Sequence, residues 1–353
     1  MKLLLVELTR FRSRRAIALM LLAAALLTAA LAASAVYDTR PVSGEDRAAA
    51  QAQADRDAAR PRVQREVELC EADPERFFGP GTEAALCAEE IVPSIEWYLF
   101  RQPLSLGEQR GDAGLAIVLI VAALMTIVGS TFAGADWASG SVSNQVLFEP
   151  RRLKVWAAKA VAVFTATLLA SAVILTAFWI TLYVVAQIRG IDTGAAVQSD
   201  LRWMIARGAL LTAAGATGGY ALTMLVRHTV GTLAVLFAFA VGGEALTAAL
   251  PIQGAGRWSL ANNVFAFVQD GHRYYDYSMP CGRNGCDQSV LLTLTGGATY
   301  LGPLLLVVML LSAVSFWRPT SPEPSRRAGV VPTPSTRRPP DWGAAGLRRR
   351  MTK

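Results

Sequence analysis

The residues whose types and spacing suggest chemistry are gathered between positions 134 and 159, where a segment joins two long apolar runs. Carboxylates and guanidinium groups in such a segment recognise opposite charges, either on another protein or on lipid phosphates. Residues 141–148 are predicted to form a short helix with one apolar side, which Pro150 ends. The candidate residues are Asp136, Trp137, Gly140, Ser141, Glu149, Pro150, Arg151, Arg152 and Lys159. The alternative is that the cations among them only anchor the segment to anionic headgroups.

Glu244 is the one acid within an apolar run long enough to cross a bilayer. A carboxylate at membrane depth is costly and usually faces a partner or a wet cavity. One hypothesis places Glu244 on a translocation route or makes it a proton acceptor. The other has its carboxyl group bonded to a Ser or Thr on a neighbouring helix near the outer vestibule. Both stay open at this point.

Other catalytic chemistry finds little support in the sequence. The chain has no G-x-x-x-x-G-K-[ST] phosphate-binding loop. Its two histidines, His228 and His272, are predicted to lie on opposite sides of the membrane, which argues against a histidine-based metal site. No Ser-His-Asp or Cys-His arrangement is indicated. We therefore expect neither a resident metal nor a cofactor, and no enzymatic activity in the chain itself.

Composition predicts an all-α protein that crosses a membrane several times. Of 353 residues, 53% are apolar and 17% are charged, and apolar runs of roughly 20 residues recur. Such spans must be helical because lipid offers the backbone no hydrogen-bond partner. About six spans are predicted, at 16–36, 113–135, 160–186, 203–226, 230–250 and 290–317.

Basic residues predict the orientation of these spans. With both termini inside, the inner segments hold about 19 Lys and Arg against 5 acids, and the outer segments about 15 against 21. The net charge of +7 therefore reflects sidedness and needs no nucleic acid to explain it. We predict a multi-pass protein of the cytoplasmic membrane.

The four cysteines support the same sidedness, because all fall in predicted outer loops. An even number on the oxidising face predicts two disulfides, Cys70–Cys87 and Cys281–Cys286. Four residues separate Cys281 from Cys286, which does not fit the C-x-x-C spacing of a redox motif.

The segments between the spans have distinct characters. Residues 1–15 suit an amphipathic helix in the inner interface, although a cleavable leader is an alternative reading of the N-terminal region. The charged outer segment 37–112 predicts a small helical cap, with helices at 44–60, 62–71 and 83–90, or else a solvated linker. Residues 187–202 form an outer loop. Residues 251–289 form either a re-entrant hairpin or a surface loop, and the basic tail 318–353 is predicted to be disordered along the inner leaflet.

The arrangement of spans and the segment 134–159 together resemble the permease subunit of an ABC-2 type transporter. In that family the second span ends with an acid, then Gly-Thr or Gly-Ser, an apolar stretch, Pro, Arg and a Lys that opens the third span. Here these are Asp136, Gly140-Ser141, 142–148, Pro150-Arg151-Arg152 and Lys159. The closest resemblance is to permeases from high-GC, actinobacteria-like organisms with Glu-Pro-Arg-Arg at 149–152. Asp136 stands where the family more often has Glu.

The resemblance implies an exporter subunit that works as a homodimer or with a paired permease. ATP and magnesium would be bound by a separate ABC ATP-binding subunit, which would grip the segment 136–159 from the cytosol. Drug, lipid, peptide and glycan exporters share this architecture, and no residue selects among them. The rival hypotheses are a membrane-anchored sensor or scaffold with an outer binding cap, and an intramembrane enzyme that uses Glu244.

Overall fold

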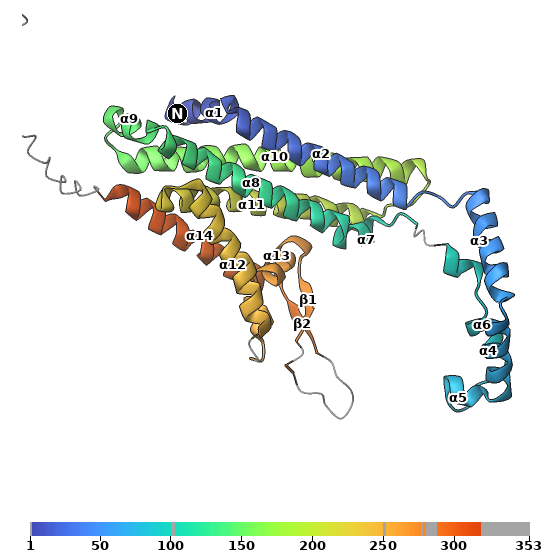
Figure 1. Cartoon of the computed structure of the whole chain (residues 1–353). Helices are drawn as coiled ribbons and strands as arrows, with labels where there is room; N and C mark the ends of the chain where they lie inside the picture. The colour runs from blue at the N-terminus through green and yellow to red at the C-terminus, as the bar shows by residue number, and fades with distance from the viewer. Residues whose placement is uncertain (1, 100–102, 250–251, 277, 280–287, 319–353) are drawn as a thin grey trace, which may run out of the picture. The chain divides into compact units, whose positions relative to one another are not determined.

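The computed structural model describes residues 2–99, 103–249, 252–276, 278–279 and 288–318 (Figure 1). Within these residues, six helices are long and apolar enough to cross a membrane. They are α2 (Arg15–Asp38), α8 (Ala113–Ala138), α10 (Arg152–Ile188), α11 (Ala195–Val226), α12 (Thr229–Ala249) and α14 (Leu294–Trp317). The prediction of a helical protein with six membrane-spanning segments is confirmed by length and composition.

Two helices begin well before the predicted spans. The third span was expected at 160–186, yet α10 begins at Arg152, and the fourth was expected at 203–226, yet α11 begins at Ala195. Hydropathy marks only the apolar part of a helix, whereas backbone hydrogen bonding carries the helix on through flanking polar residues. Lys159 therefore lies about two turns inside α10 and not at its start.

The N-terminal segment forms a separate helix, α1 (Lys2–Ser13), as predicted for residues 1–15. Arg14 has an extended backbone, with φ −82° and ψ 116°, which separates α1 from α2. The buried side chains of α1 include Glu7 and Phe11, while Leu5 and Val6 are exposed. A carboxylate on the buried face of a helix needs partners inside the fold.

The core of the bundle forms where α8, α10 and α11 pack together, with α2 against α8 and α10 (Figure 1). Small residues bring α8 and α11 into close contact. A Cβ atom added to Gly129 of α8 would lie 1.9 Å from the carbonyl oxygen of Ala216, and one on Gly219 would lie 2.6 Å from that of Thr126. The small residues of α11 thus bring it close to another helix of the same chain.

Two apolar helices stay largely uncovered within the described part of the chain. Only 6% of the most apolar window of α12 and 11% of that of α14 is buried, against 56% for α11. Lipid or other protein must cover these faces in a membrane.

The segment between α12 and α14 folds into a short helix and a hairpin, which corrects the expectation of a purely α-helical chain. A 3₁₀ turn, η2 (Ala255–Trp258), precedes α13 (Leu260–Gln269). Strands β1 (His272–Tyr275) and β2 (Ser289–Leu292) then pair antiparallel, with His272 opposite Leu292. Helix α13 lies tightly on α14, since a Cβ on Gly297 would lie 2.6 Å from the Asn263 carbonyl oxygen. The strands are only four residues each, too short for a clear alternating pattern.

The first polar segment is helical, with helices at or near the three ranges predicted for it. It contains α3 (Gly44–Ala58), α4 (Pro61–Ala72), α5 (Pro74–Phe78), α6 (Ala85–Ile91) and the 3₁₀ turn η1 (Ile95–Tyr98), followed by α7 (Leu106–Gly111). Ser43 and Asp46 form a capping box at the start of α3. Pro61 begins α4, where the missing N–H of proline costs nothing. We call the part from α3 to η1 the cap.

The disulfide prediction is confirmed for one pair. Cys70 of α4 is bonded to Cys87 of α6, with the Cα atoms 5.8 Å apart. The second predicted pair, Cys281 and Cys286, lies outside the described residues, as does the basic tail beyond Arg318.

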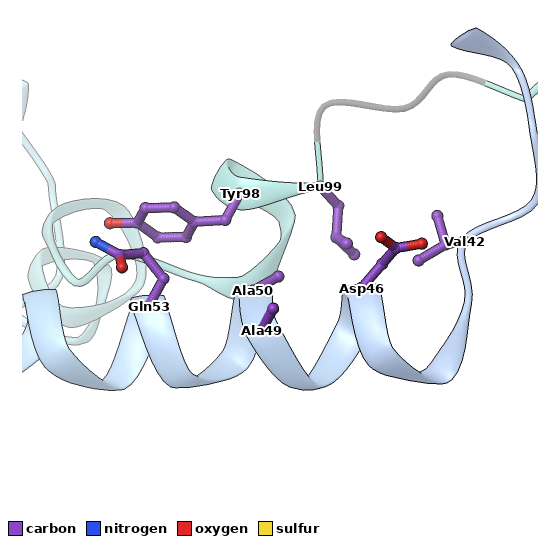
Figure 2. A pocket seen from close by; sticks show the side chains of 7 residues that line it. All are labelled: Val42, Asp46, Ala49, Ala50, Gln53, Tyr98 and Leu99. Carbon is purple, nitrogen blue, oxygen red and sulfur yellow. The ribbon is translucent and has the colours of Figure 1, made fainter. Parts of the chain in front are cut away.

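Tyr98 fastens the end of the cap to its first helix. Its hydroxyl group donates a hydrogen bond to Oδ2 of Asp57 over 2.6 Å. The Tyr98 ring lies over α3 beside Gln53, and Leu99 lies near Asp46, so that together they border a pocket of about 370 Å³ (Figure 2).

Candidate functional site

A buried cluster of opposite charges joins three helices at one end of the bundle. Lys159 of α10 has 1% of its side chain exposed. Its Nζ atom donates to Oε2 of Glu7 over 2.9 Å and to Oδ2 of Asp136 over 2.5 Å. Glu7 belongs to α1 and Asp136 to α8, so one ammonium group links helices that are far apart in the sequence.

A second cation pairs with Asp136. Arg14 donates from Nη2 to Oδ1 of Asp136 and from Nη1 to the carbonyl oxygen of Phe132, the latter over 2.7 Å. We call Glu7, Arg14, Asp136 and Lys159 the ion cluster. Arg10, which is more exposed, adds a third cation at its edge, with Nη1 3.5 Å from Oε1 of Glu7. Such pairing is required because an unpaired buried charge costs several kcal/mol, of the order of 3–5 when one partner is removed.

An aromatic wall shields the ion cluster. The guanidinium carbon of Arg14 lies 4.8 Å from the centroid of the Phe132 ring, and Nζ of Lys159 lies 5.3 Å from it. Phe11 packs against the same ring, with centroids 5.5 Å apart. A ring that carries cations beside its negative face stabilises their charge while it excludes water.

A short helix, α9 (Ser141–Phe148), is attached to this cluster by two side chains. Ser141 donates to Oδ1 of Asp136 over 3.0 Å, and Nε2 of Gln145 donates to Oε1 of Glu7 over 2.9 Å. The two residues are four positions apart and so lie on one side of the helix. Helix α9 has the bounds that the sequence predicted.

The C-terminal end of α9 is exposed and apolar. Leu147 is 80% and Phe148 is 91% exposed, although both are large hydrophobic side chains. We call these two residues the α9 tip. Gly140, with φ +68°, lets the chain turn sharply from α8 into α9. Pro150 follows the helix and leads into α10.

The structure divides the predicted site residues into two groups. Asp136, Ser141 and Lys159 meet in and around the ion cluster. Glu149, Arg151 and Arg152 form no ion pair or side-chain hydrogen bond with any described residue, and Arg151 and Pro150 are exposed. Trp137 turns to a different partner, because the guanidinium carbon of Arg227 lies 5.1 Å from its ring centroid.

Glu7 was missed by sequence reasoning, although it belongs to the ion cluster. It is the one acid in α1, among apolar and basic residues. A lone carboxylate at a helical position in line with Phe11 is the signal that could have found it, since i and i+4 share a face. Gln145 was missed for another reason, because nothing in its local sequence distinguishes it from a solvated residue.

Glu244 makes the contacts of the second hypothesis raised for it. Its carboxylate accepts from the hydroxyl group of Ser259 over 2.8 Å and from the backbone N–H of Ala261 over 2.8 Å. Ser259 is the N-cap residue of α13. Glu244 of α12 therefore holds the start of α13 by satisfying helix donors that would otherwise lack partners. Its place on a translocation route stays a prediction.

The described residues contain no group of three or more His, Cys, Asp or Glu side chains placed to hold a metal ion. The ion cluster itself links α1, α8 and α10 by electrostatic attraction. No family model, no curated protein and no solved structure matches the chain.

Proposed function

We propose that this chain is the transmembrane permease subunit of an ABC-2 type transporter, an exporter driven by ATP hydrolysis on a separate ATP-binding subunit. The observation that supports the proposal most is that α9 is bonded to the bundle and also exposes apolar side chains. Ser141 and Gln145 bond α9 to the ion cluster, and the apolar α9 tip at its C-terminal end is exposed. A helix with these contacts can bind a partner subunit through its exposed end and can transmit the movement of that subunit to the bundle.

The push would reach three membrane-spanning helices. Gln145 contacts Glu7 of α1, which leads into α2, while Ser141 contacts Asp136 of α8, and Lys159 brings in α10. A tilt of α9 therefore either moves α1 and α8 or breaks its hydrogen bonds to the carboxylates of Glu7 and Asp136, and a lost hydrogen bond to a buried charged group is costly. Closing of two ATP-binding subunits would tilt these helices and switch a cavity between two permease subunits from inward to outward access.

Binding of the ATP-binding subunit to the α9 tip is tested by co-purification of that subunit with variants of the tip. Phe148→Asp and Leu147→Asp should reduce recovery of that subunit, because they place charge where an apolar groove is expected. Leu69→Asp is the matched control, since Leu69 is also an exposed apolar residue, 59% exposed, but lies in the cap. Equal recovery with all three variants would reject the assignment of α9.

The transmission is tested separately with Gln145→Ala. This variant should still bind the ATP-binding subunit through the intact α9 tip, but transport per ATP hydrolysed should fall because the contact with Glu7 is lost.

The orientation of the chain in the membrane is tested with Arg151→Cys, which should react with an impermeant maleimide only after the membrane is opened. Reaction in intact cells would overturn the proposal.

A further inference from the structure

The cap contains a second feature that the ion cluster does not explain. A pocket of about 600 Å³ lies between α3, α4, α5, α6 and η1. Its volume is within the range of sites for small organic molecules. The lining residues that matter here are Glu66, Phe77, Phe78, Glu90, Trp97 and Tyr98.

Three of the lining aromatic side chains are unusually accessible. Phe77 is 43%, Phe78 is 42% and Trp97 is 50% exposed. A single exposed aromatic residue is unremarkable, but three around one hollow form an apolar surface that a water-exposed unit would otherwise bury. Their rings offer faces that attract a cation, with Trp as the best partner.

The charge around the pocket favours a positive ligand. Asp57 is already engaged, because it accepts from Tyr98 over 2.6 Å and pairs with Arg60 over 2.7 Å. Glu66 and Glu90 are exposed and form no ion pair with any described residue, and Arg62 is the one cation of the lining in the same state. Across residues 44–99 there are 13 acids and 6 bases, a net charge of −7.

We propose that this pocket binds an organic cation with a bulky aromatic or apolar body. The apolar body would lie against Phe77, Phe78 and Trp97, and the positive charge would face their rings and the carboxylates of Glu66 and Glu90. Binding of this kind rests on the cap alone and requires no transport, so it stands whether or not the chain is a permease.

The disulfide links two of the helices that line the pocket. The bond between Cys70 and Cys87 connects α4, which carries Glu66, to α6, which carries Glu90. Without that bond, α6 and the following turn η1 lose their covalent hold on α4. Reduction of the purified protein should therefore weaken binding.

The test uses tetraphenylphosphonium and tetraphenylborate, two ions of the same shape and opposite charge, with the full chain in detergent. We expect the phosphonium ion to bind more tightly than the borate, and Trp97→Ala to weaken its binding about tenfold. Glu66→Gln combined with Glu90→Gln should narrow the preference for the cation. Leu69→Ala, an exposed apolar residue of α4 that is not in the pocket lining, is the control and should change nothing.

Three results would overturn the proposal. The first is equal affinity for the two ions, the second is unchanged phosphonium binding in both Trp97→Ala and Phe77→Ala, and the third is binding that survives reduction of the disulfide. Because the cap could be disturbed by a substitution, each variant is checked for the Cys70–Cys87 bond by thiol labelling. A variant that keeps its disulfide yet loses the cation preference supports the site, and treatment with dithiothreitol that leaves binding intact contradicts it.

Discussion

Lys159 and Glu7 are 152 positions apart in the chain, yet the ammonium nitrogen of the first lies 2.9 Å from a carboxylate oxygen of the second. Both side chains are almost completely buried. The pair ties the N-terminal helix α1 to α10, and with Asp136 of α8 it joins the three helices in one electrostatic unit. The following predictions address this unit and the features that support it.

Replacing Lys159 by Met is expected to destabilise the protein by about 3–5 kcal/mol, because Glu7 and Asp136 would lose the buried cation that they share. The double variant Lys159→Met with Glu7→Gln should recover part of that loss, since the remaining buried carboxylate, Asp136, is still paired with Arg14. Thermal unfolding of the purified protein measures both. Lys154→Met is the control, as Lys154 is exposed. Additive effects of the two core substitutions would contradict the pairing.

Gly129→Ala is expected to destabilise the bundle by about 1–3 kcal/mol, because the new methyl group would meet the Ala216 carbonyl oxygen, 1.9 Å from the ideal Cβ position. Gly242→Ala in α12 is the matched control. No atom lies within 4 Å of its Cβ position, so the higher helix propensity of Ala should leave the stability unchanged or slightly raised. Equal unfolding temperatures for the two variants would show that α8 and α11 are not in this contact.

The bond between Tyr98 and Asp57 is expected to give the cap a pH window. The hydrogen bond from Tyr98 lowers the pKa of the Asp57 carboxyl group below its usual 3.8, and it raises the pKa of the Tyr98 phenol above its usual 10.0. The stabilisation by ionised Asp57 is present above pH 3.8 and is lost as the pH falls through its lowered pKa. The stabilisation by the neutral phenol is present below pH 10 and is lost as the pH rises through its raised pKa.

Ultraviolet titration of tyrosinate measures the alkaline limb of that window. The signal that disappears in Tyr98→Phe should titrate above pH 10 in the natural protein. In an Asp57→Asn background the same phenol should titrate closer to pH 10, because the charged acceptor is gone. A Tyr98 signal at the same pH with and without Asp57 would mean that the hydrogen bond does not form.

Glu244→Ala is expected to speed amide hydrogen exchange in the first turn of α13, since Ala261 would lose the acceptor that its N–H has at 2.8 Å. Asp192→Ala, at an exposed carboxylate outside this contact, should leave α13 unchanged. Unchanged amide exchange in α13 of Glu244→Ala would contradict the helix-capping role. If transport were lost in the same variant, the result would support the translocation hypothesis.

The sequence by itself determined the features that depend on neighbouring residues. Apolar runs of sufficient length predicted six helices, and the order Gly140, 141–148, Pro150 predicted the bounds of α9, because turn and helix-stop signals act locally. Cys70 and Cys87 could be paired for the same reason, since each lies on a short predicted helix of one small unit. The first residues of α10 and α11 were not predicted correctly, because a helix can continue into polar residues where hydropathy falls.

Only the tertiary structure decided what the charged residues face. The sequence does not distinguish Asp136 and Lys159 from Arg151 and Arg152. All four are charged residues of one segment between two spans. The fold buries the first two against Glu7 and Arg14 and leaves Arg151 exposed. The same holds for Glu244, whose partner Ser259 begins another helix. A charge at a given position is compatible with solvent, lipid or an opposite charge, and the choice depends on which distant helix packs against it.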